Sequence, residues 1–179
     1  TGNLLKVNHT ASLGSGNTSG HMVHFTSVNN STDGDYNVII GADAGLALTN
    51  NNANVLIGRE AGKAITTQST TVLIGYQAGV ALNSNDANGT VGLGYEAAAN
   101  ITSGQRGTYL GYRAGKFEST GDDNVAIGWE AGSGGSGAAG NAGNRNTTIG
   151  SYAGTVLAKT GAGSDNTFIG YKAGMSTTH

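Results

Sequence analysis

Eight copies of one nine-residue phrase constrain the fold of this chain more than any other feature. The first copy is NVIIGADAG (Asn37–Gly45), the last is NTFIGYKAG (Asn166–Gly174), and neighbouring copies lie 17–22 residues apart. A unit this short cannot enclose a hydrophobic core alone, so the copies must stack and bury their apolar side chains against one another. The repeat therefore predicts a solenoid. The six copies between are NVLIGREAG (Asn54–Gly62), TVLIGYQAG (Thr71–Gly79), TVGLGYEAA (Thr90–Ala98), GTYLGYRAG (Gly107–Gly115), NVAIGWEAG (Asn124–Gly132) and NTTIGSYAG (Asn146–Gly154).

Composition favours β-structure over helix or disorder. The 179 residues include 32 Gly and no Pro, and 11% are charged. Glycine inside a helix costs about 1 kcal/mol relative to Ala, so glycines this frequent exclude long helices. The regularly placed Val, Ile and Leu argue against disorder. We predict an all-β protein, a parallel β-solenoid or β-roll with one coil for each of the eight copies.

Each phrase predicts a short strand followed by a bend. We number its positions 1 to 9 and the segments that start with each copy coils 1 to 8. Side chains alternate across a strand, so Val and Ile at positions 2 and 4 share one side, which we expect to face the interior. Position 5 is Gly in every copy, as a bend with positive φ requires, and position 8 is Ala, which fits a narrow coil. These structural repeat residues are Gly41, Gly58, Gly75, Gly94, Gly111, Gly128, Gly150 and Gly170, with Ala44, Ala61, Ala78, Ala97, Ala114, Ala131, Ala153 and Ala173.

Two further expectations concern the rest of the coil. An apolar residue three after the phrase predicts a second short strand, so that two strands and two corners make a thin roll. These residues are Leu48, Ile65, Leu82, Ile101 and Leu157. Position 3 would point away from the interior, and five copies carry a large apolar side chain there: Ile39, Leu56, Leu73, Tyr109 and Phe168. An apolar row on the outside would have to be buried against another chain. Three chains around one axis would bury it, so we expect a homotrimer.

Residues 1–36 differ from the repeats. GNLLKV (Gly2–Val7) and GHMVHF (Gly20–Phe25) align with an 18-residue offset and indicate two rungs of a different β-structure. The polar, turn-rich NNSTDGDY (Asn29–Tyr36) then marks a boundary. We therefore predict an N-terminal stalk-like β segment, 1–36, and a repeat β-solenoid, 37–179. Because the sequence begins with Thr1, we expect it to be a fragment or a processed product of a longer chain.

The consensus N-[VT]-x-[IL]-G-x-x-A-G resembles the repeats of two classes of fibrous protein. It is similar to the N-T-x-I-G-x-x-A-G repeats of bacteriophage tail-fibre-like proteins, and to the S-x-A-I-G-x-x-A pattern in the β-roll heads of trimeric autotransporter adhesins. The resemblance covers residues 37–174 well and 1–36 loosely, and the coils here are longer than the adhesin unit. It implies a homotrimeric parallel roll that serves as a structural and host-attachment segment of a tail fibre on a virion. The alternative is a bacterial surface adhesin head or a secreted fibrous matrix protein.

Position 6 carries the main binding candidates. Five of its eight residues are aromatic: Tyr76, Tyr95, Tyr112, Trp129 and Tyr171. Equivalent positions of stacked coils lie above one another, so these rings predict an aromatic row that offers apolar faces to sugar rings and hydrogen bonds to their hydroxyls. The alternative is that the rings pack between protomers or cover the corner of each coil.

Other candidates have ordinary structural explanations. The longest interruption of the repeat, Gly132–Asn146, predicts a loop that contributes Arg145 to binding or serves as a spacer. His21 and His24 suggest a metal site, but they align with polar strand positions and we predict no metal. Asp residues in turns, such as Asp122 and Asp123, fit hydrogen-bonded turns better than calcium sites. Position 7 predicts a solvated polar row without the cleft that glycoside hydrolysis requires.

The remaining features exclude several classes of function. The net charge is −2 with scattered basic residues, so we expect no nucleic-acid partner. There is no Cys, and no apolar run approaches the roughly 20 residues of a membrane helix, so we expect no membrane insertion. With four histidines and no catalytic constellation, we predict neither enzymatic activity nor a cofactor. The expected partners are further copies of the chain and a bacterial cell-surface receptor or glycan.

Overall fold

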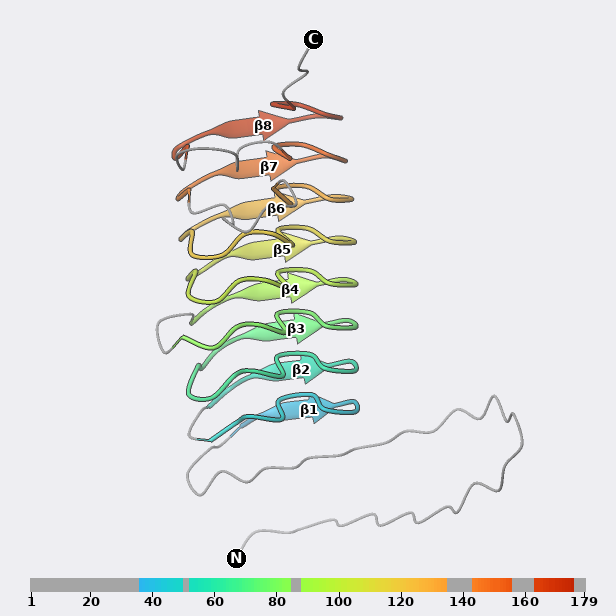
Figure 1. Ribbon diagram of the computed structural model, residues 1–179, viewed down its shortest axis with the longest axis vertical. Helices are drawn as coiled ribbons and strands as arrows, with labels where there is room; N and C mark the ends of the chain where they lie inside the picture. Colours follow the sequence, from blue (N-terminus) through green and yellow to red (C-terminus); the bar gives the residue numbers. More distant parts are fainter. Residues whose placement is uncertain (1–35, 50–51, 85–87, 135–142, 156–162, 176–179) are drawn as a thin grey trace, which may run out of the picture.

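The chain folds into a stack of coils with one strand in each coil (Figure 1). The computed structural model describes residues 36–49, 52–84, 88–134, 143–155 and 163–175. The strands are β1 (Val38–Ile40), β2 (Val55–Ile57), β3 (Val72–Ile74), β4 (Val91–Leu93), β5 (Thr108–Leu110), β6 (Val125–Ile127), β7 (Thr147–Ile149) and β8 (Thr167–Ile169). They form one parallel sheet in sequence order, so each strand pairs only with its neighbours in the chain. The predicted parallel β-solenoid is confirmed.

The register keeps equivalent positions of the phrase directly above one another. Coils of different length do not disturb it. Val72 still pairs with Val91 where the spacing is 19 residues, and Val125 with Thr147 where it is 22. The strand register is therefore independent of coil length, and every position of the phrase forms a continuous column along the solenoid.

Position 5 is where neighbouring backbones approach most closely. In coil 3, Gly75 has a φ of 137°, and a Cβ there would overlap with the carbonyl oxygen of Gly94 in coil 4. The Gly75 amide also donates to the Ile57 carbonyl of coil 2 at 2.7 Å. Glycine is the residue that meets both the positive φ and the close approach.

Position 3 faces the interior, and the orientation expected from the sequence is wrong. Leu56, Leu73 and Tyr109 are fully buried, whereas positions 2 and 4 of their strands are partly exposed. The sequence pattern misled because the regular Val and Ile at positions 2 and 4 favoured that pair for the interior. Asn54 at position 1 is fully buried, and positions 1 and 3 share one side of a strand. The apolar row at position 3 is therefore core from Ile39 to Tyr109, and Phe168 in the last coil is half-buried.

The expected second strand is absent from the described residues. The return segment consists of consecutive turns instead: in coil 2 the Ala61 amide donates to Gly58 at 3.2 Å and the Ile65 amide to Gly62 at 3.1 Å. The apolar side chains three residues after the phrase are nevertheless core, with at most 4% of their surface exposed. They are Leu48, Ile65, Leu82 and Ile101. In coils 1 to 4 the described residues thus form one strand followed by turns, with an interior filled from positions 3 and 8 and from this column.

Inside the stack, position 1 forms a ladder of amide and hydroxyl side chains. The Asn54 Oδ1 accepts hydrogen bonds from the Thr71 amide (2.9 Å) and hydroxyl (2.8 Å) of the next coil. The Asn54 Nδ2 donates to the Gln68 carbonyl at 3.0 Å and to the Asn37 Oδ1 at 3.1 Å. Each buried amide therefore ties its own coil to its neighbours, and its polar atoms are satisfied away from water.

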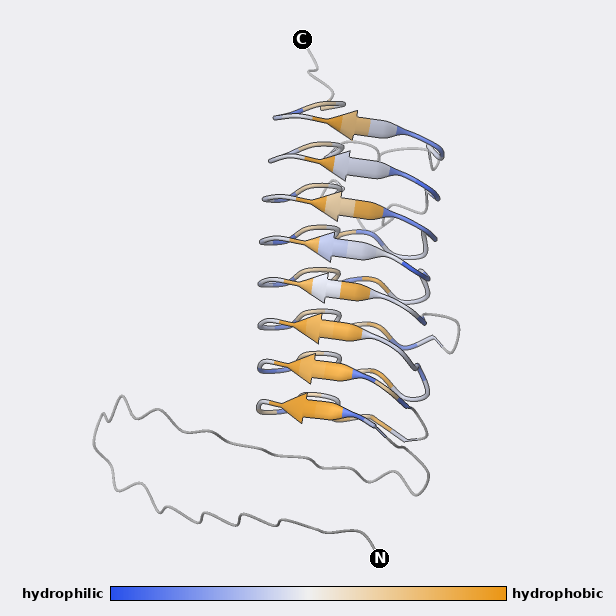
Figure 2. Ribbon diagram, turned by 180° about the vertical axis from the view of Figure 1, so that it is seen from behind, coloured by the Kyte–Doolittle hydropathy of each residue, from blue (hydrophilic) through white to orange (hydrophobic). Residues whose placement is uncertain are grey.

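The outer face of the sheet is apolar and uncharged. Positions 2 and 4 of the eight strands hold only Val, Ile, Leu and Thr. Figure 2 shows this composition along the stack, with β1, β2 and β3 coloured as hydrophobic throughout and paler stretches in β5, β7 and β8. Val38 at one end and Ile169 at the other are 46% and 67% exposed. This outer face runs the length of the sheet with no described segment of the chain over it.

Several expectations fall outside the described residues. The predicted stalk-like segment 1–36 lies there except for Tyr36, as do His21, His24 and Leu157. Residues 135–142, which make up most of the loop predicted at Gly132–Asn146, also lie outside the described residues.

Candidate functional site

The aromatic row at position 6 forms a column of stacked rings along one corner of the coils. The ring centroids of Tyr76 and Tyr95 are 5.2 Å apart, those of Tyr95 and Tyr112 5.1 Å, and those of Tyr112 and Trp129 4.1 Å. The interplanar angles are 13°, 8° and 14°, so the four rings lie nearly parallel. Their separation follows the spacing of hydrogen-bonded strands, about 4.7–4.9 Å. Within this aromatic column the inner ring faces cover one another, and the ring edges meet solvent.

The two ends of the aromatic column differ. At the lower end the Arg59 guanidinium carbon lies 5.8 Å from the Tyr76 ring centroid, so that face carries a cation. At the upper end the next residue in the column is Ser151, which has no ring, and Trp129 is 48% exposed. Tyr171, the last aromatic candidate, lies one coil further and is 70% exposed. The expected row of five therefore consists of four stacked rings, a gap at Ser151 and one separate ring.

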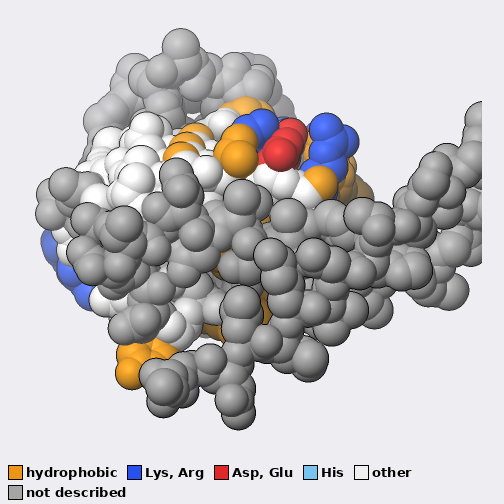
Figure 3. All heavy atoms as spheres, turned by 90° about the horizontal axis from the view of Figure 1, so that it is seen from below, with side chains coloured by type: hydrophobic (Ala, Val, Ile, Leu, Met, Phe, Trp, Pro, Cys, Tyr) orange, Lys and Arg blue, Asp and Glu red, His pale blue; other side chains and the backbone are white. Residues whose placement is uncertain are grey.

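Position 7 beside the aromatic column is more tightly paired than the solvated row expected from the sequence. The Glu96 side chain is 14% exposed and accepts hydrogen bonds from Arg113 Nε at 2.7 Å and Lys116 Nζ at 2.5 Å. Burial raises the pKa of Glu96, but these two cations outweigh it and lower the pKa overall. Gln77 donates in the same way to Glu60 at 2.6 Å. Seen from below, acidic and basic side chains lie side by side at one edge of the stack (Figure 3).

Arg145 belongs to a different column, one residue before the phrase. Its guanidinium donates to both carboxylate oxygens of Asp165, at 2.5 and 2.8 Å. Two coils lower, Arg106 makes the same bidentate pair with Asp123, at 2.6 and 2.9 Å. The hydrogen bonds from the arginines lower the pKa of both aspartates. Arg145 thus belongs to an alternating Arg–Asp ladder, in a different column from the aromatic rings that are the other binding candidates.

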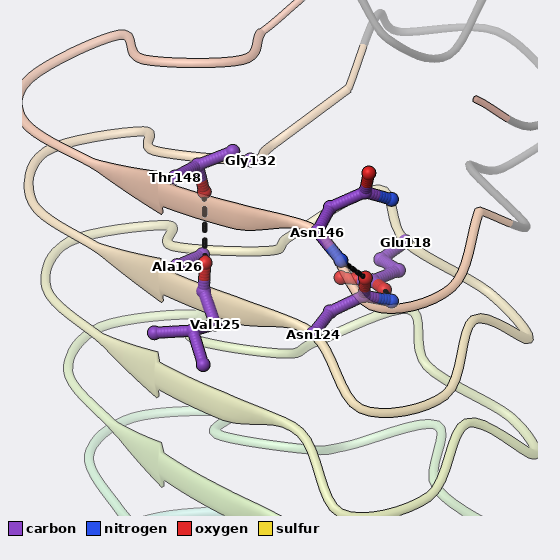
Figure 4. A pocket seen from close by; sticks show the side chains of 7 residues that line it. All are labelled: Glu118, Asn124, Val125, Ala126, Gly132, Asn146 and Thr148. Carbon is purple, nitrogen blue, oxygen red and sulfur yellow. Dashed lines mark hydrogen bonds between the residues drawn. The ribbon is translucent and has the colours of Figure 1, made fainter. Parts of the chain in front are cut away.

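A buried polar cluster interrupts the core between coils 5 and 7. Glu118 occupies the column that holds Leu or Ile in coils 1 to 4, and it is 2% exposed. Asn124 Nδ2 donates to its carboxyl oxygen and to the Gly143 carbonyl. Figure 4 shows Glu118, Asn124 and Asn146 grouped at one side of a small cavity, with Thr148 across it. The cavity holds about 10 Å³, room for about one water molecule.

Tyr109 and Glu118 share this cluster. The ring of Tyr109 fills the interior of coil 5, and a Cβ on Gly107 would overlap with it, which explains why coil 5 has Gly at position 1. The Tyr109 hydroxyl is buried without a hydrogen bond of ordinary geometry among the described residues. Burial raises the pKa of Glu118 to about 8, and the nearby Asp122 carboxylate adds to the effect. Glu118 is therefore a neutral carboxylic acid at pH 7.

The sequence contains signals for these features that were not used. Glu118 stands at the residue three after the phrase, where four other coils have an aliphatic side chain. The residues just before the last four phrases alternate Arg106, Asp123, Arg145 and Asp165. A column-by-column alignment of the coils exposes both patterns, because equivalent residues of a solenoid are spatial neighbours.

Comparison with family models, curated proteins and solved structures gives no match for this chain. Within the described part of the chain, no group of His, Cys, Asp and Glu is placed to hold a metal ion. The same residues include no helix long and apolar enough to span a membrane. The candidate site therefore has to be judged on its own geometry: a stacked aromatic column with polar side chains beside it.

Proposed function

We propose that this chain is a structural and host-attachment segment of a homotrimeric phage tail fibre that binds a glycan or protein on the bacterial surface. The observation that carries the proposal is the pairing of two surfaces on one stack: an uncharged apolar sheet face and, at a corner, a partly exposed aromatic column. The sequence resemblance to tail-fibre repeats supports the same assignment.

The outer face of the sheet replaces position 3 as the surface where chains would associate. Eight strands at about 4.8 Å spacing and three residues at about 3.3 Å give a face of roughly 38 by 10 Å, or about 400 Å². Contiguous apolar patches of this size on a single chain are often functional. Its rows of mostly β-branched side chains suit close packing of sheet on sheet. Three copies around a common axis would remove this face from water.

The trimer can be tested by light scattering with a matched pair of variants. We expect the wild type to have three times the chain mass of 17.8 kDa. Ile74→Lys, in the middle of the outer face, should give monomers, because a buried unpaired ammonium is costly. Ala42→Lys adds the same charge at an exposed site away from that face and should leave the trimer intact. A monomeric wild type, or an Ile74→Lys variant that stays trimeric, would contradict the proposed assembly.

Attachment can be tested with labelled protein and intact bacteria. We expect saturable binding that falls after periodate oxidation of the cell-surface glycans, because an aromatic site recognises the hydroxyls and the apolar faces of intact sugar rings. Loss of binding after protease treatment of the cells would identify a protein receptor instead. Absence of saturable binding to any bacterial surface in a broad panel would refute the attachment function and leave a purely structural fibre.

A further inference from the structure

The gap in the aromatic column at Ser151 lies between two ring-bearing coils that are in register. The Tyr152 amide donates to the Trp129 carbonyl at 2.8 Å, and the Lys172 amide donates to the Ser151 carbonyl at 3.0 Å. These bonds continue the ladder of coils 6, 7 and 8 at this corner. Trp129, Ser151 and Tyr171 therefore occupy equivalent places one above the other.

Trp129 is stacked on a described ring on one side only. That ring is Tyr112, at 4.1 Å between centroids, and the contact fixes the indole plane across the axis of the stack. Trp129 is 48% exposed, and Tyr171, which stacks on no described ring, is 70% exposed. The Lys172 ammonium lies 5.1 Å from the Tyr171 ring centroid. The only side chain at position 6 between them is the small hydroxymethyl group of Ser151.

The size of the gap selects the kind of ring that fits. Two coil spacings separate the Trp129 and Tyr171 positions, or about 9.6 Å. A flat ring in contact with two aromatic faces needs about 7–8 Å, twice a carbon–carbon contact of ~3.5–4.0 Å. A puckered saturated ring, which has hydrogens standing on both faces, is thicker and fills the larger separation better.

The side chains around the gap suit a polyol. Position 7 of the same three coils provides a carboxylate, a phenol and an ammonium group, in Glu130, Tyr152 and Lys172. Ser151, at position 6 between the two rings, adds a hydroxyl that can both donate and accept. Rings above and below with polar groups at the side match a sugar, whose faces are apolar and whose rim is hydroxylated.

We propose that the gap between Trp129 and Tyr171 binds one pyranose ring of a cell-surface glycan. This site rests on the proposed attachment function and gives it a ligand class. Trp129 and Tyr171 cover the two faces of the sugar, and Ser151 leaves the space between them. The stacked rings below Trp129 hold its indole in place before the sugar arrives.

The single Trp of the chain reports on this site directly. We would titrate the methyl pyranosides of glucose, galactose, N-acetylglucosamine and rhamnose, each to ~100 mM, and follow tryptophan emission. This concentration fills even a site with a Kd of about 1 mM or weaker. At least one sugar should quench or shift the emission saturably. If none does, or if p-cresol binds more tightly than every sugar, the pyranose site is refuted.

Substitution of Ser151 provides the decisive variant. Ser151→Tyr completes the aromatic column and should weaken sugar binding at least tenfold while keeping the unfolding temperature at or above that of the wild type. Ser151→Ala preserves the gap and should retain binding, and Tyr76→Ala, at the far end, should not change it. Sugar binding by Ser151→Tyr equal to the wild type would overturn the site.

Whole-cell binding separates this proposal from the attachment function. If the wild type binds bacteria and Ser151→Tyr binds equally well, attachment stands and the pyranose gap is wrong. If the wild type binds the methyl pyranosides but no bacteria, the gap stands and the attachment function is wrong.

Discussion

Glu118 makes the stability of this solenoid depend on pH in an unusual direction. Its carboxyl lies in an otherwise aliphatic column of the core, and burial raises its pKa from 4.5 to about 8. The folded chain therefore holds a proton that the unfolded chain releases above pH 4.5. The free energy of unfolding is therefore unaffected by this group below pH 4.5, falls as the pH rises from 4.5 to about 8, and levels off above that.

The size of the effect follows from the two pKa values. Each pH unit between them costs 1.36 kcal/mol, so the full loss above pH 8 is about 5 kcal/mol. At pH 7 the loss is about 3 kcal/mol, from the ratio of the two proton affinities. This is a large fraction of the 5–15 kcal/mol that stabilises a typical domain. We expect urea-unfolding experiments to show a free energy of unfolding that falls by roughly 1.4 kcal/mol per unit between pH 5 and 8.

Two variants at Glu118 and one control test this reasoning. Glu118→Gln keeps the shape but cannot ionise, so its stability should be nearly independent of pH in this range and exceed the wild type at pH 8. Glu118→Leu, which continues the column of Leu48, Ile65, Leu82 and Ile101, should behave the same way. Glu130→Gln removes a more accessible carboxylate and should keep the pH dependence of the wild type. Parallel curves for wild type and Glu118→Gln would refute the buried neutral acid.

Two further predictions concern the backbone contacts and the amide ladder. Gly75→Ala should lower the free energy of unfolding by about 3 kcal/mol or more, because the new Cβ would overlap with the Gly94 carbonyl. Gly170 is the matched control, since it has a similar φ of 122° but no atom within 4 Å of the position that a Cβ would take. Gly170→Ala should therefore cost only the backbone strain, about 1–3 kcal/mol. Chemical denaturation of the pair measures the difference, and equal losses would mean that strain and not contact requires Gly. Asn54→Leu should cost several kcal/mol, about 1–3 for each buried partner left without its bond, such as the Thr71 amide and hydroxyl. A loss below about 1 kcal/mol in thermal or urea unfolding would show that the ladder contributes little.

The repeat made the stack and its single direction predictable, because eight equivalent short phrases have few ways to bury apolar surface other than on one another. Which side of the strand faces inward was not predictable from alternation alone. Positions 2 and 4 are the more regular apolar pair, and position 3 varies from Leu73 to Gly92 to Tyr109. The interior accommodates the large Tyr109 ring because glycines of the same coil, Gly107 and Gly115, leave room for it. The outer face is more regular, with Val or Thr at position 2 and Ile or Leu at position 4.

The aromatic column shows a different limit. Its vertical alignment followed from the repeat, but the stacking of ring on ring did not, and it changes the available surface from ring faces to ring edges. The gap at Ser151 indicates a binding site only together with the exposure of Trp129 and Tyr171, which the sequence does not show. Glu118 and the Arg–Asp ladder are predictable only when equivalent positions of successive coils are compared, because these positions are 17–22 residues apart in the sequence and adjacent in the stack.

Because each strand is bonded only to the strands before and after it, tension along the stack loads the coils one at a time. A pull on the two ends of one chain would peel off the outermost coil, then the next, while the rest stays folded. A 17-residue coil extends to about 60 Å once released, against the roughly 5 Å that it occupies in the stack. A filament of this design dissipates work in regular steps and lengthens before it breaks.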